Sequence, residues 1–126
     1  MRLFGMLIAA AFAVAAPAQA GESHFDGAQF QAIQQRNAPV ILFVHAPWCP
    51  ICRAQEKTVA KLLATPRYKG VTVLTIDFDT QKSLWSKFGV TSQSTLIAFH
   101  GRRETGRLSY DSDPAKITAL FASALS

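Results

Sequence analysis

The chain has 126 residues, a net charge of +5 at neutral pH and only two cysteines. A chain of this length accommodates one domain with a modest hydrophobic core. The basic residues are scattered, with no run longer than Arg102-Arg103, whereas nucleic-acid-binding proteins gather their positive charge into patches. Length and charge therefore predict a single domain and argue against nucleic acid as its partner.

The first twenty residues have the pattern of an export signal. Arg2 provides a short positive start, and residues 3–16 form an apolar run without charge. This run is shorter than the roughly 20 residues of a membrane span, and Ala18-Gln19-Ala20 has the small-x-small pattern that signal peptidase cleaves. We predict a signal peptide over residues 1–20 and a periplasmic domain over residues 21–126, with no membrane span after cleavage. An uncleaved membrane anchor is the alternative.

Beyond the signal, amphipathic stretches alternate with short apolar runs that are rich in branched residues. We predict helices over residues 26–36, 49–63, 80–88 and 114–125, and strands over residues 40–44, 71–78, 95–100 and 104–110. This order gives two parallel strands joined by a crossover helix, followed by an antiparallel hairpin. The fold class is therefore α/β, with a central mixed four-stranded sheet flanked by helices.

Cys49 and Cys52 open the second predicted helix, directly after the apolar strand 40–44. At this spacing one helical turn brings both side chains onto the same face, within reach of a disulfide. Unpaired N–H groups and the helix dipole favour a thiolate at Cys49. A thiolate attacks disulfides, and a second thiol three residues on can resolve the mixed disulfide. Because so small a ring adds little stability, the pair indicates redox chemistry.

The block from Ala46 to Arg53, which includes Trp48-Cys49-Pro50-Ile51-Cys52, resembles the active site of the thioredoxin family. Phe88-Gly89-Val90, the run 95–99 and Gly101 resemble later landmarks of that family, so the similarity covers essentially the whole mature chain. It implies a thioredoxin-like fold with Cys49 as the attacking thiol and Cys52 as the buried resolving thiol. The residues that it places along the bound client are Trp48, Pro50, Ile51, Gln93 and Ser94.

Ser94 is the first departure from the family, which places a cis-proline there, facing the two sulfurs. A cis bond before a residue other than proline costs about 2.5–4 kcal/mol. The loop therefore has either a strained cis Gln93–Ser94 bond or a trans bond, and the similarity of the neighbouring residues favours cis. In relatives the proline also keeps the thiols from capturing metal. A serine offers a hydroxyl near Cys49 and leaves metal or iron–sulfur binding open, unless it is merely a tolerated loop residue.

The second departure is the absence of the family's buried proton acceptor. Relatives have an aspartate six residues before the first cysteine and a lysine paired with it, and these positions are Phe43 and Val73 here. The proton of Cys52 then goes to water, to Glu56 one turn along the helix, or to no nearby group. Glu56 otherwise reads as a solvated surface carboxylate.

The histidines and the residues between the cysteines give weaker signals. His45, four residues before Cys49, is either a redox participant or a polar strand end, whereas His24 and His100 do not converge on the cysteines. Pro50 and Ile51 include no histidine to stabilise the thiolate strongly. This argues against the oxidising end of the family's range, which runs from about −270 to −120 mV.

The sequence therefore predicts an exported thiol–disulfide oxidoreductase that reduces client proteins and needs no metal or other cofactor. Because one small domain has no electron source of its own, a membrane-bound electron donor is an implied partner. The alternative is a binding module in which Cys49 and Cys52 hold copper or bridge an iron–sulfur cluster between two protomers. A third possibility is an inert interaction domain.

Overall fold

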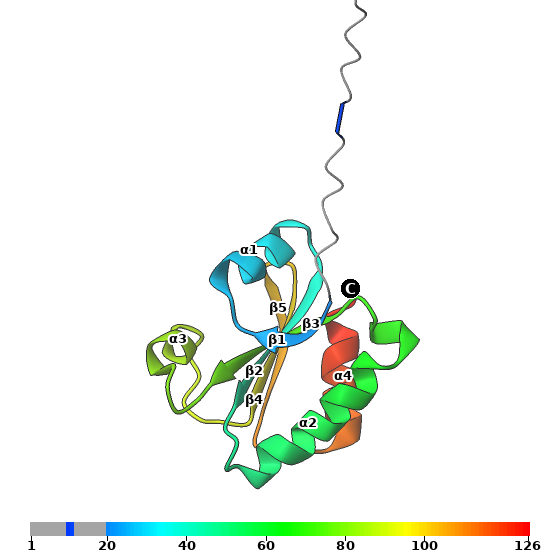
Figure 1. Ribbon diagram of the computed structural model, residues 1–126. Coiled ribbons are helices and arrows are strands. Elements are labelled where there is room, and N and C mark those ends of the chain that lie inside the picture. The colour runs from blue at the N-terminus through cyan, green and yellow to red at the C-terminus, as the bar shows by residue number, and fades with distance from the viewer. Residues whose placement is uncertain (1–9, 12–19) are drawn as a thin grey trace, which may run out of the picture.

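The structure is a computed structural model that describes residues 10–11 and 20–126. The predicted signal peptide lies almost entirely outside the described residues, so its prediction stands as made. Within the described part of the chain, no helix combines the length and apolar character needed to cross a membrane. The domain from residue 21 onward forms three layers, with a sheet between two pairs of helices (Figure 1).

The sheet has five strands in the order β1-β3-β2-β4-β5. The strands are β1 (Gly21–His24), β2 (Pro39–His45), β3 (Thr72–Asp77), β4 (Thr95–His100) and β5 (Arg103–Ser109). β3 runs parallel to both β1 and β2, while β4 runs antiparallel to β2 and β5. The predicted α/β class, crossover and hairpin are confirmed, but the sheet has five strands rather than four. The additional strand, β1, is short and mostly polar, and it is ordered by pairing with the edge of β3.

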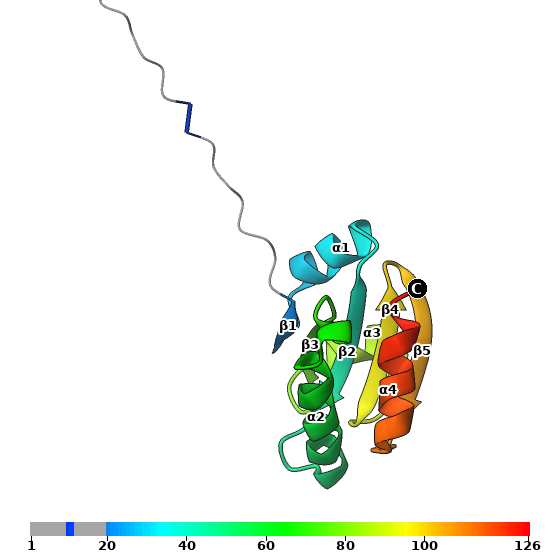
Figure 2. The ribbon, with the colours of Figure 1, turned by 90° about the vertical axis from the view of Figure 1, so that its right-hand side faces the viewer.

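The helices cover both faces of the sheet. They are α1 (Gly27–Gln35), α2 (Pro50–Leu63), α3 (Lys82–Lys87) and α4 (Pro114–Ser123), with a short 3-10 turn at Pro66–Tyr68. α1 and α3 lie on one face and α2 and α4 on the other, as the two views show (Figures 1 and 2). Asp26 caps α1 by accepting a hydrogen bond from the Ala28 N–H at 2.9 Å, as the sequence predicts.

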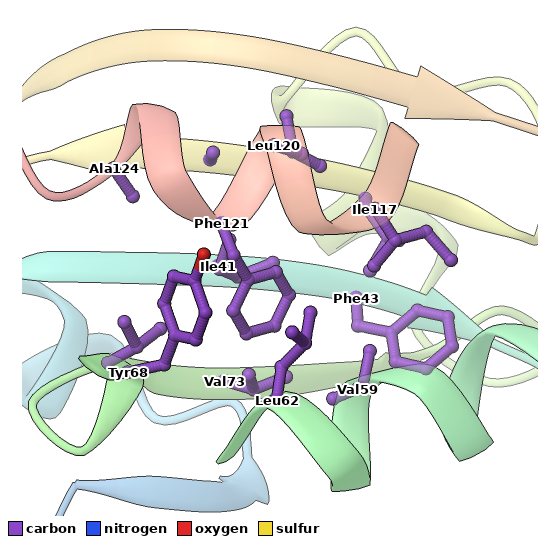
Figure 3. Packing of buried hydrophobic residues seen from close by; sticks show 13 residues of the cluster. Ile41, Phe43, Val59, Leu62, Tyr68, Val73, Ile117, Leu120, Phe121 and Ala124 are labelled. Carbon is purple, nitrogen blue, oxygen red and sulfur yellow. The ribbon is translucent and has the colours of Figure 1, made fainter. Parts of the chain in front are cut away.

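Strand β2 supplies side chains to the core on both of its faces. Ile41 and Phe43 point toward α2 and α4, whereas Val40, Leu42 and Val44 point toward α1 and α3. Because both faces are covered, the strand is a continuous apolar run. Figure 3 shows the side facing α2 and α4, where Phe43 lies among Val59, Ile117 and other apolar side chains. This central strand leads directly into the segment that carries the cysteines.

Candidate active site

Cys49 occupies the N-cap position of α2, and Cys52 lies in the first turn of that helix. The Cys49 sulfur accepts a hydrogen bond from the Cys52 N–H at 3.3 Å, in the way that a capping side chain does. Pro50 is the first helical residue, where the lack of an N–H has no cost. Both thiols are free. Cys52 is fully buried and Cys49 is 3% exposed, so the structure holds a reduced dithiol in which both side chains are buried and only Cys49 keeps a small exposed fraction.

The Ser94 hydroxyl contacts both sulfurs. Its oxygen lies 3.1 Å from the sulfur of Cys49 and 3.0 Å from the sulfur of Cys52, and the side chain is fully buried. A hydroxyl can donate one hydrogen bond and accept others. Ser94 can therefore donate to a thiolate at Cys49 while it accepts from the thiol of Cys52. Sequence reasoning placed the hydroxyl near Cys49 but did not anticipate the contact with Cys52.

The expected cis bond before Ser94 is wrong. The described chain contains no cis peptide bond, and Ser94 instead adopts a left-handed conformation with φ of 61°. The Ser94 N–H donates to the Val44 carbonyl at 2.9 Å, a bond that proline could not make. A left-handed residue costs roughly 1–2 kcal/mol, less than a cis bond before serine. The loop thus brings Ser94 to the sulfurs through a backbone conformation that costs less free energy than a cis bond.

Gln55 holds this loop in place from α2. Its side chain is fully buried, and its Nε2 donates to the carbonyls of Ser94 and Asp111 at 3.0 and 3.1 Å. The Ser94 carbonyl also accepts from the Tyr110 N–H at 3.1 Å. Sequence reasoning missed Gln55, although a signal was present. It lies at helical spacing between Cys52 and Val59, on the buried side of the helix.

The two thiols ionise very differently. Burial of the sulfur would raise the pKa of Cys49, but hydrogen bonds from the Ser94 hydroxyl and the Cys52 N–H outweigh burial and lower it to about 7. Burial raises the pKa of Cys52, and so does the nearby Cys49 sulfur. The contact with the Ser94 hydroxyl lowers this pKa, but not enough to cancel the rise. Near neutral pH the site therefore has a thiolate at Cys49 and a protonated thiol at Cys52, which suits attack by the first and delayed resolution by the second.

We expect alkylation of Cys49 by iodoacetamide to follow the thiolate fraction, with a midpoint near pH 7. Because the folded pKa lies below the unfolded value of 9.0, the ionised sulfur also stabilises the reduced fold. This stabilisation is complete above about pH 9 and is lost as the pH falls through 7. Above pH 9 the raised pKa of Cys52 acts in the opposite direction. Rate profiles of the wild type and Cys52→Ser check the midpoint, and a value above pH 9 in both would contradict it.

Trp48 lies beside the cysteines with its ring at the surface. The side chain is 56% exposed. Its Nε1 donates to the carboxylate of Asp79, at 2.9 and 3.1 Å from the two oxygens. The ring is thus held in one orientation although little covers it. Of the two residues between the cysteines, Pro50 is exposed and Ile51 packs partly buried against the sulfurs.

The two apolar residues that replace the family's charged pair are buried as predicted. Neither the carboxylate of Glu56 nor the imidazole of His45 takes the place of that pair as a proton acceptor for Cys52. Phe43 and Val73 belong to the core beneath α2 (Figure 3). Glu56 faces His45, with 3.4 Å between its Oε2 and the histidine Nε2. Neither residue makes a hydrogen bond to a sulfur among the described contacts. For the proton of Cys52, the Ser94 hydroxyl is the side-chain group in contact.

The remaining candidate residues have other partners. His24 is part of β1, and its Nδ1 lies 3.4 Å from the Thr75 hydroxyl. His100 Nδ1 lies 2.8 Å from the Ala124 carbonyl. Gln93 adjoins Ser94 and accepts a hydrogen bond from the Tyr110 hydroxyl at 3.2 Å. Across residues 10–11 and 20–126, no group of three or more His, Cys, Asp and Glu side chains is arranged to hold a metal ion.

Comparisons with known proteins agree with the geometry. Residues 22–122 match the family model for thioredoxin. A thioredoxin from Alicyclobacillus acidocaldarius is 33% identical over 81 residues, which are 64% of this chain and 76% of that protein. Both cysteines, Gln55 and Ser94 lie inside the span matched by the family model.

Solved structures show the same fold. Trxlp from Edwardsiella tarda EIB202 superposes with a TM-score of 0.75 at 35% identity, covering 79% of this chain and 98% of that one. Thioredoxin O2 from Arabidopsis thaliana superposes with a TM-score of 0.67 at 19% identity, covering 79% and 86% of the two chains. The second likeness concerns the fold alone, because its identity is low.

Proposed function

This chain belongs to the thioredoxin family of thiol–disulfide oxidoreductases, and we propose that it is an exported member that reduces disulfides of client proteins. One observation carries the proposal: a free dithiol in which the pKa of Cys49 is about 7 while that of Cys52 is raised. Strongly oxidising members of this group have an attacking thiol with a pKa near 3.5, whereas reducing members have values near 7.

The reaction transfers two electrons from the dithiol to the client. The Cys49 thiolate attacks one sulfur of the client disulfide, forms a mixed disulfide and releases the other client sulfur as a thiolate. Cys52 then attacks the Cys49 sulfur, which forms the Cys49–Cys52 disulfide and releases the second client thiolate. The client ends with two thiols, and the protein with one disulfide. The N-cap position of Cys49 and its lowered pKa, against the raised pKa of Cys52, set this order of attack.

Ser94 supplies the proton path that the family's carboxylate provides elsewhere. Cys52 must lose its proton to attack, and its sulfur lies 3.0 Å from the Ser94 hydroxyl. That hydroxyl also lies 3.1 Å from the sulfur of Cys49. As Cys52 gives its proton to the serine oxygen, the serine can pass its own proton toward the client thiolate that leaves from Cys49. No charge then remains buried between the two sulfurs.

The client backbone has a place to bind beside this path. The N–H and carbonyl of Gln93 make no hydrogen bond within the described chain, and the residue is only partly buried, so these groups are open to a partner. An extended client segment can pair with them as an added strand. Trp48, Pro50 and Ile51 border the same sulfur and complete the client surface that the family resemblance implies.

Export and an external electron source complete the proposal. The support for export is the pattern of residues 1–20, which predicts cleavage after Ala20. After one turnover the protein is oxidised, and nothing in a single thioredoxin domain re-reduces it. A membrane-bound thiol donor that faces the periplasm is the partner that a periplasmic reductant needs.

Binding of a metal or cluster by Cys49 and Cys52 is the rival hypothesis from the sequence. Structural metal sites of thiolate type have four ligands, and the described residues offer these two thiols without a third ligand beside them. A site would therefore need ligands from a second protein or another molecule. Metal analysis of the purified protein decides this, because stoichiometric copper, zinc or iron that is lost in Cys49→Ser would favour the rival.

A redox titration of the mature domain tests the reductant assignment. We expect a potential between about −270 and −200 mV after equilibration in glutathione or dithiothreitol buffers, which is the reducing part of the family's range. A potential near −120 mV would leave an oxidoreductase but would reverse the direction of electron flow. N-terminal sequencing of protein from a periplasmic extract should begin at Gly21, and protein confined to the cytoplasm with Met1 intact would refute export.

A further inference from the structure

The surplus positive charge of the domain is concentrated in α2 and the turn that follows it. Residues 50–69 contain five basic residues and one acidic residue, which gives this segment a net charge of +4. The rest of the domain from residue 21 onward has seven basic and seven acidic residues, so it is neutral overall. All five cations of the segment are exposed, namely Arg53, Lys57, Lys61, Arg67 and Lys69.

Three of these cations form what we call the basic face of α2: Arg53, Lys57 and Lys61. They are four residues apart, and this spacing places side chains on successive turns of one side of a helix. Glu56, the one carboxylate of the helix, faces His45 instead. None of the three cations makes an ion pair within the described part of the chain. Because like charges at this spacing destabilise a helix slightly, helix formation alone does not favour the arrangement.

An open hollow of about 640 Å³ adjoins the basic face, between α2 and the start of α4. The two helices lie side by side on the same face of the sheet (Figures 1 and 2). Arg53 and Lys57 line the hollow from α2 together with Thr58, and Ser112 lines it from the segment before α4. The hollow also reaches Pro50, the residue after Cys49. A partner that lies on the basic face and fills the hollow therefore comes close to the dithiol.

The acidic residues that adjoin Ser112 in the chain have other partners. The carboxylate of Asp111 accepts a hydrogen bond from Lys116 Nζ at 2.6 Å. The carboxylate of Asp113 caps α4 by accepting from the Ala115 N–H at 2.9 Å. Neither forms an ion pair with a cation of the basic face. The cations beside the hollow thus lack a counter-charge from this chain, and carboxylates of a partner would supply it.

The shape of this surface favours a protein over a membrane. A helix that lies on a bilayer combines its basic side chains with large apolar ones that enter the lipid. Among the large hydrophobic residues in the described part of the chain, only Trp48 and Tyr110 are exposed, and neither lines the hollow. A hollow beside aligned cations fits a projecting protein segment that carries acidic side chains at matching intervals.

We propose that the basic face and its hollow dock an acidic segment of the dithiol protein that re-reduces this chain. The inference rests on the proposed disulfide reduction, because each turnover leaves a Cys49–Cys52 disulfide. Clients differ in surface charge, whereas the electron donor is one recurring partner, and a fixed charged surface suits such a partner. A donor thiolate attacks the Cys49 sulfur and releases Cys52. The second donor thiol then releases Cys49, which leaves the donor as a disulfide and this chain as a dithiol.

The test measures how fast dithiol peptides reduce the oxidised protein. Three helical peptides share one cysteine pair and carry Glu, Gln or Lys at three positions that are four residues apart. At about 0.01 M salt we expect the Glu peptide to react about tenfold faster than the Gln peptide, as electrostatic steering allows, and the Lys peptide to be slowest. At about 1 M salt the rates should converge, because charges are then screened beyond about 3 Å. Stopped-flow tryptophan fluorescence follows the reaction.

Two double variants separate the basic face from the overall charge. In Lys57→Glu with Lys61→Glu, the order of the peptides should reverse, with the Lys peptide fastest. Lys82→Glu with Lys87→Glu is the matched control, since it changes the net charge equally at exposed positions of α3, on the other face of the sheet. It should keep the preference for the Glu peptide. If the first variant fails to fold, Lys57→Gln with Lys61→Gln should still abolish most of the preference.

Three results would overturn the docking surface. The first is equal rates of the Glu and Gln peptides with the wild type. The second is an equal loss of preference in the two Glu double variants, which would assign the effect to overall charge. The third is equal peptide rates together with binding to phosphatidylglycerol vesicles that Lys57→Glu with Lys61→Glu loses, which would assign the basic face to a membrane.

Failure of the proposed function looks different from failure of the docking surface. Dithiothreitol is uncharged near neutral pH and reports the sulfur chemistry of Cys49 and Cys52 without docking. A protein that dithiothreitol reduces but that passes no electrons to the disulfides of insulin lacks the proposed function, whatever its preference among the peptides. A protein that reduces insulin but accepts electrons equally from the Glu and Gln peptides lacks only the docking surface.

Discussion

A Cys52→Ser variant is expected to accumulate as a covalent mixed disulfide with its client, and its turnover should fall at least about a thousandfold. The attacking sulfur of Cys49 keeps its hydrogen bond from the residue 52 N–H and from Ser94, so the first step survives. The second step loses its nucleophile, which the helix holds beside Cys49. An external thiol replaces it poorly, because effective molarities of well-placed groups reach about 10⁵ M or more.

Non-reducing gels of cell extracts measure this trapping, and mass spectrometry identifies the clients. Cys49→Ser is the matched control and should trap nothing, since Cys52 is fully buried and its pKa is raised. Equal trapping by the two variants, or trapping by Cys49→Ser alone, would show that the roles of the two sulfurs are assigned wrongly. Absence of trapping in both would favour the metal-binding or the inert alternative.

Ser94→Ala is expected to raise the pKa of Cys49 by about one unit and to slow resolution of the mixed disulfide at least about tenfold. The first effect follows because a hydrogen bond to a charged group is worth about 1.5–3 kcal/mol, and one pKa unit corresponds to about 1.4 kcal/mol. The second follows because acid–base assistance contributes about 10²-fold or more to such proton transfers. The attack step itself should slow only slightly, since a less acidic thiolate is more nucleophilic.

Thiolate absorbance against pH gives the first effect, and stopped-flow fluorescence of Trp48 separates attack from resolution. Ser92→Ala removes a hydroxyl from the same loop, where the serine makes no contact with either sulfur, and should match the wild type. If Ser94→Ala leaves both the pKa and the resolution rate as they are, the serine only fills space. In that event water or Glu56 takes the proton of Cys52.

The sequence predicts most of the fold because its apolar runs are long and uninterrupted. Val40 to Val44 reads as a strand covered on both faces, and it is the central strand. The run 95–100 and the turn at Gly101 predict the hairpin equally well. β1 escapes prediction because Gly-Glu-Ser-His has neither apolar alternation nor branched residues. Its strand conformation comes from the partner strand, not from its own side chains.

The site is predictable where one motif carries the chemistry and not where distant segments meet. The spacing of Cys49 and Cys52 identifies the dithiol by itself. The bridging contacts of Ser94 depend on a left-handed backbone that local sequence does not reveal, and the family resemblance pointed to cis instead. Gln55 and Tyr110 act through hydrogen bonds across more than 15 residues of chain. Such contacts are properties of the folded chain alone.

The polar strand β1 covers one edge of β3, and this cover affects the resistance of the domain to aggregation. It pairs only with β3, whose residues Val73, Leu74 and Ile76 are fully buried. If a protease removed Gly21–His24, the outer backbone of β3 would lose its cover. Bare strand edges with apolar side chains recruit strands from other molecules. Four residues with no part in the chemistry thus protect the domain from aggregation.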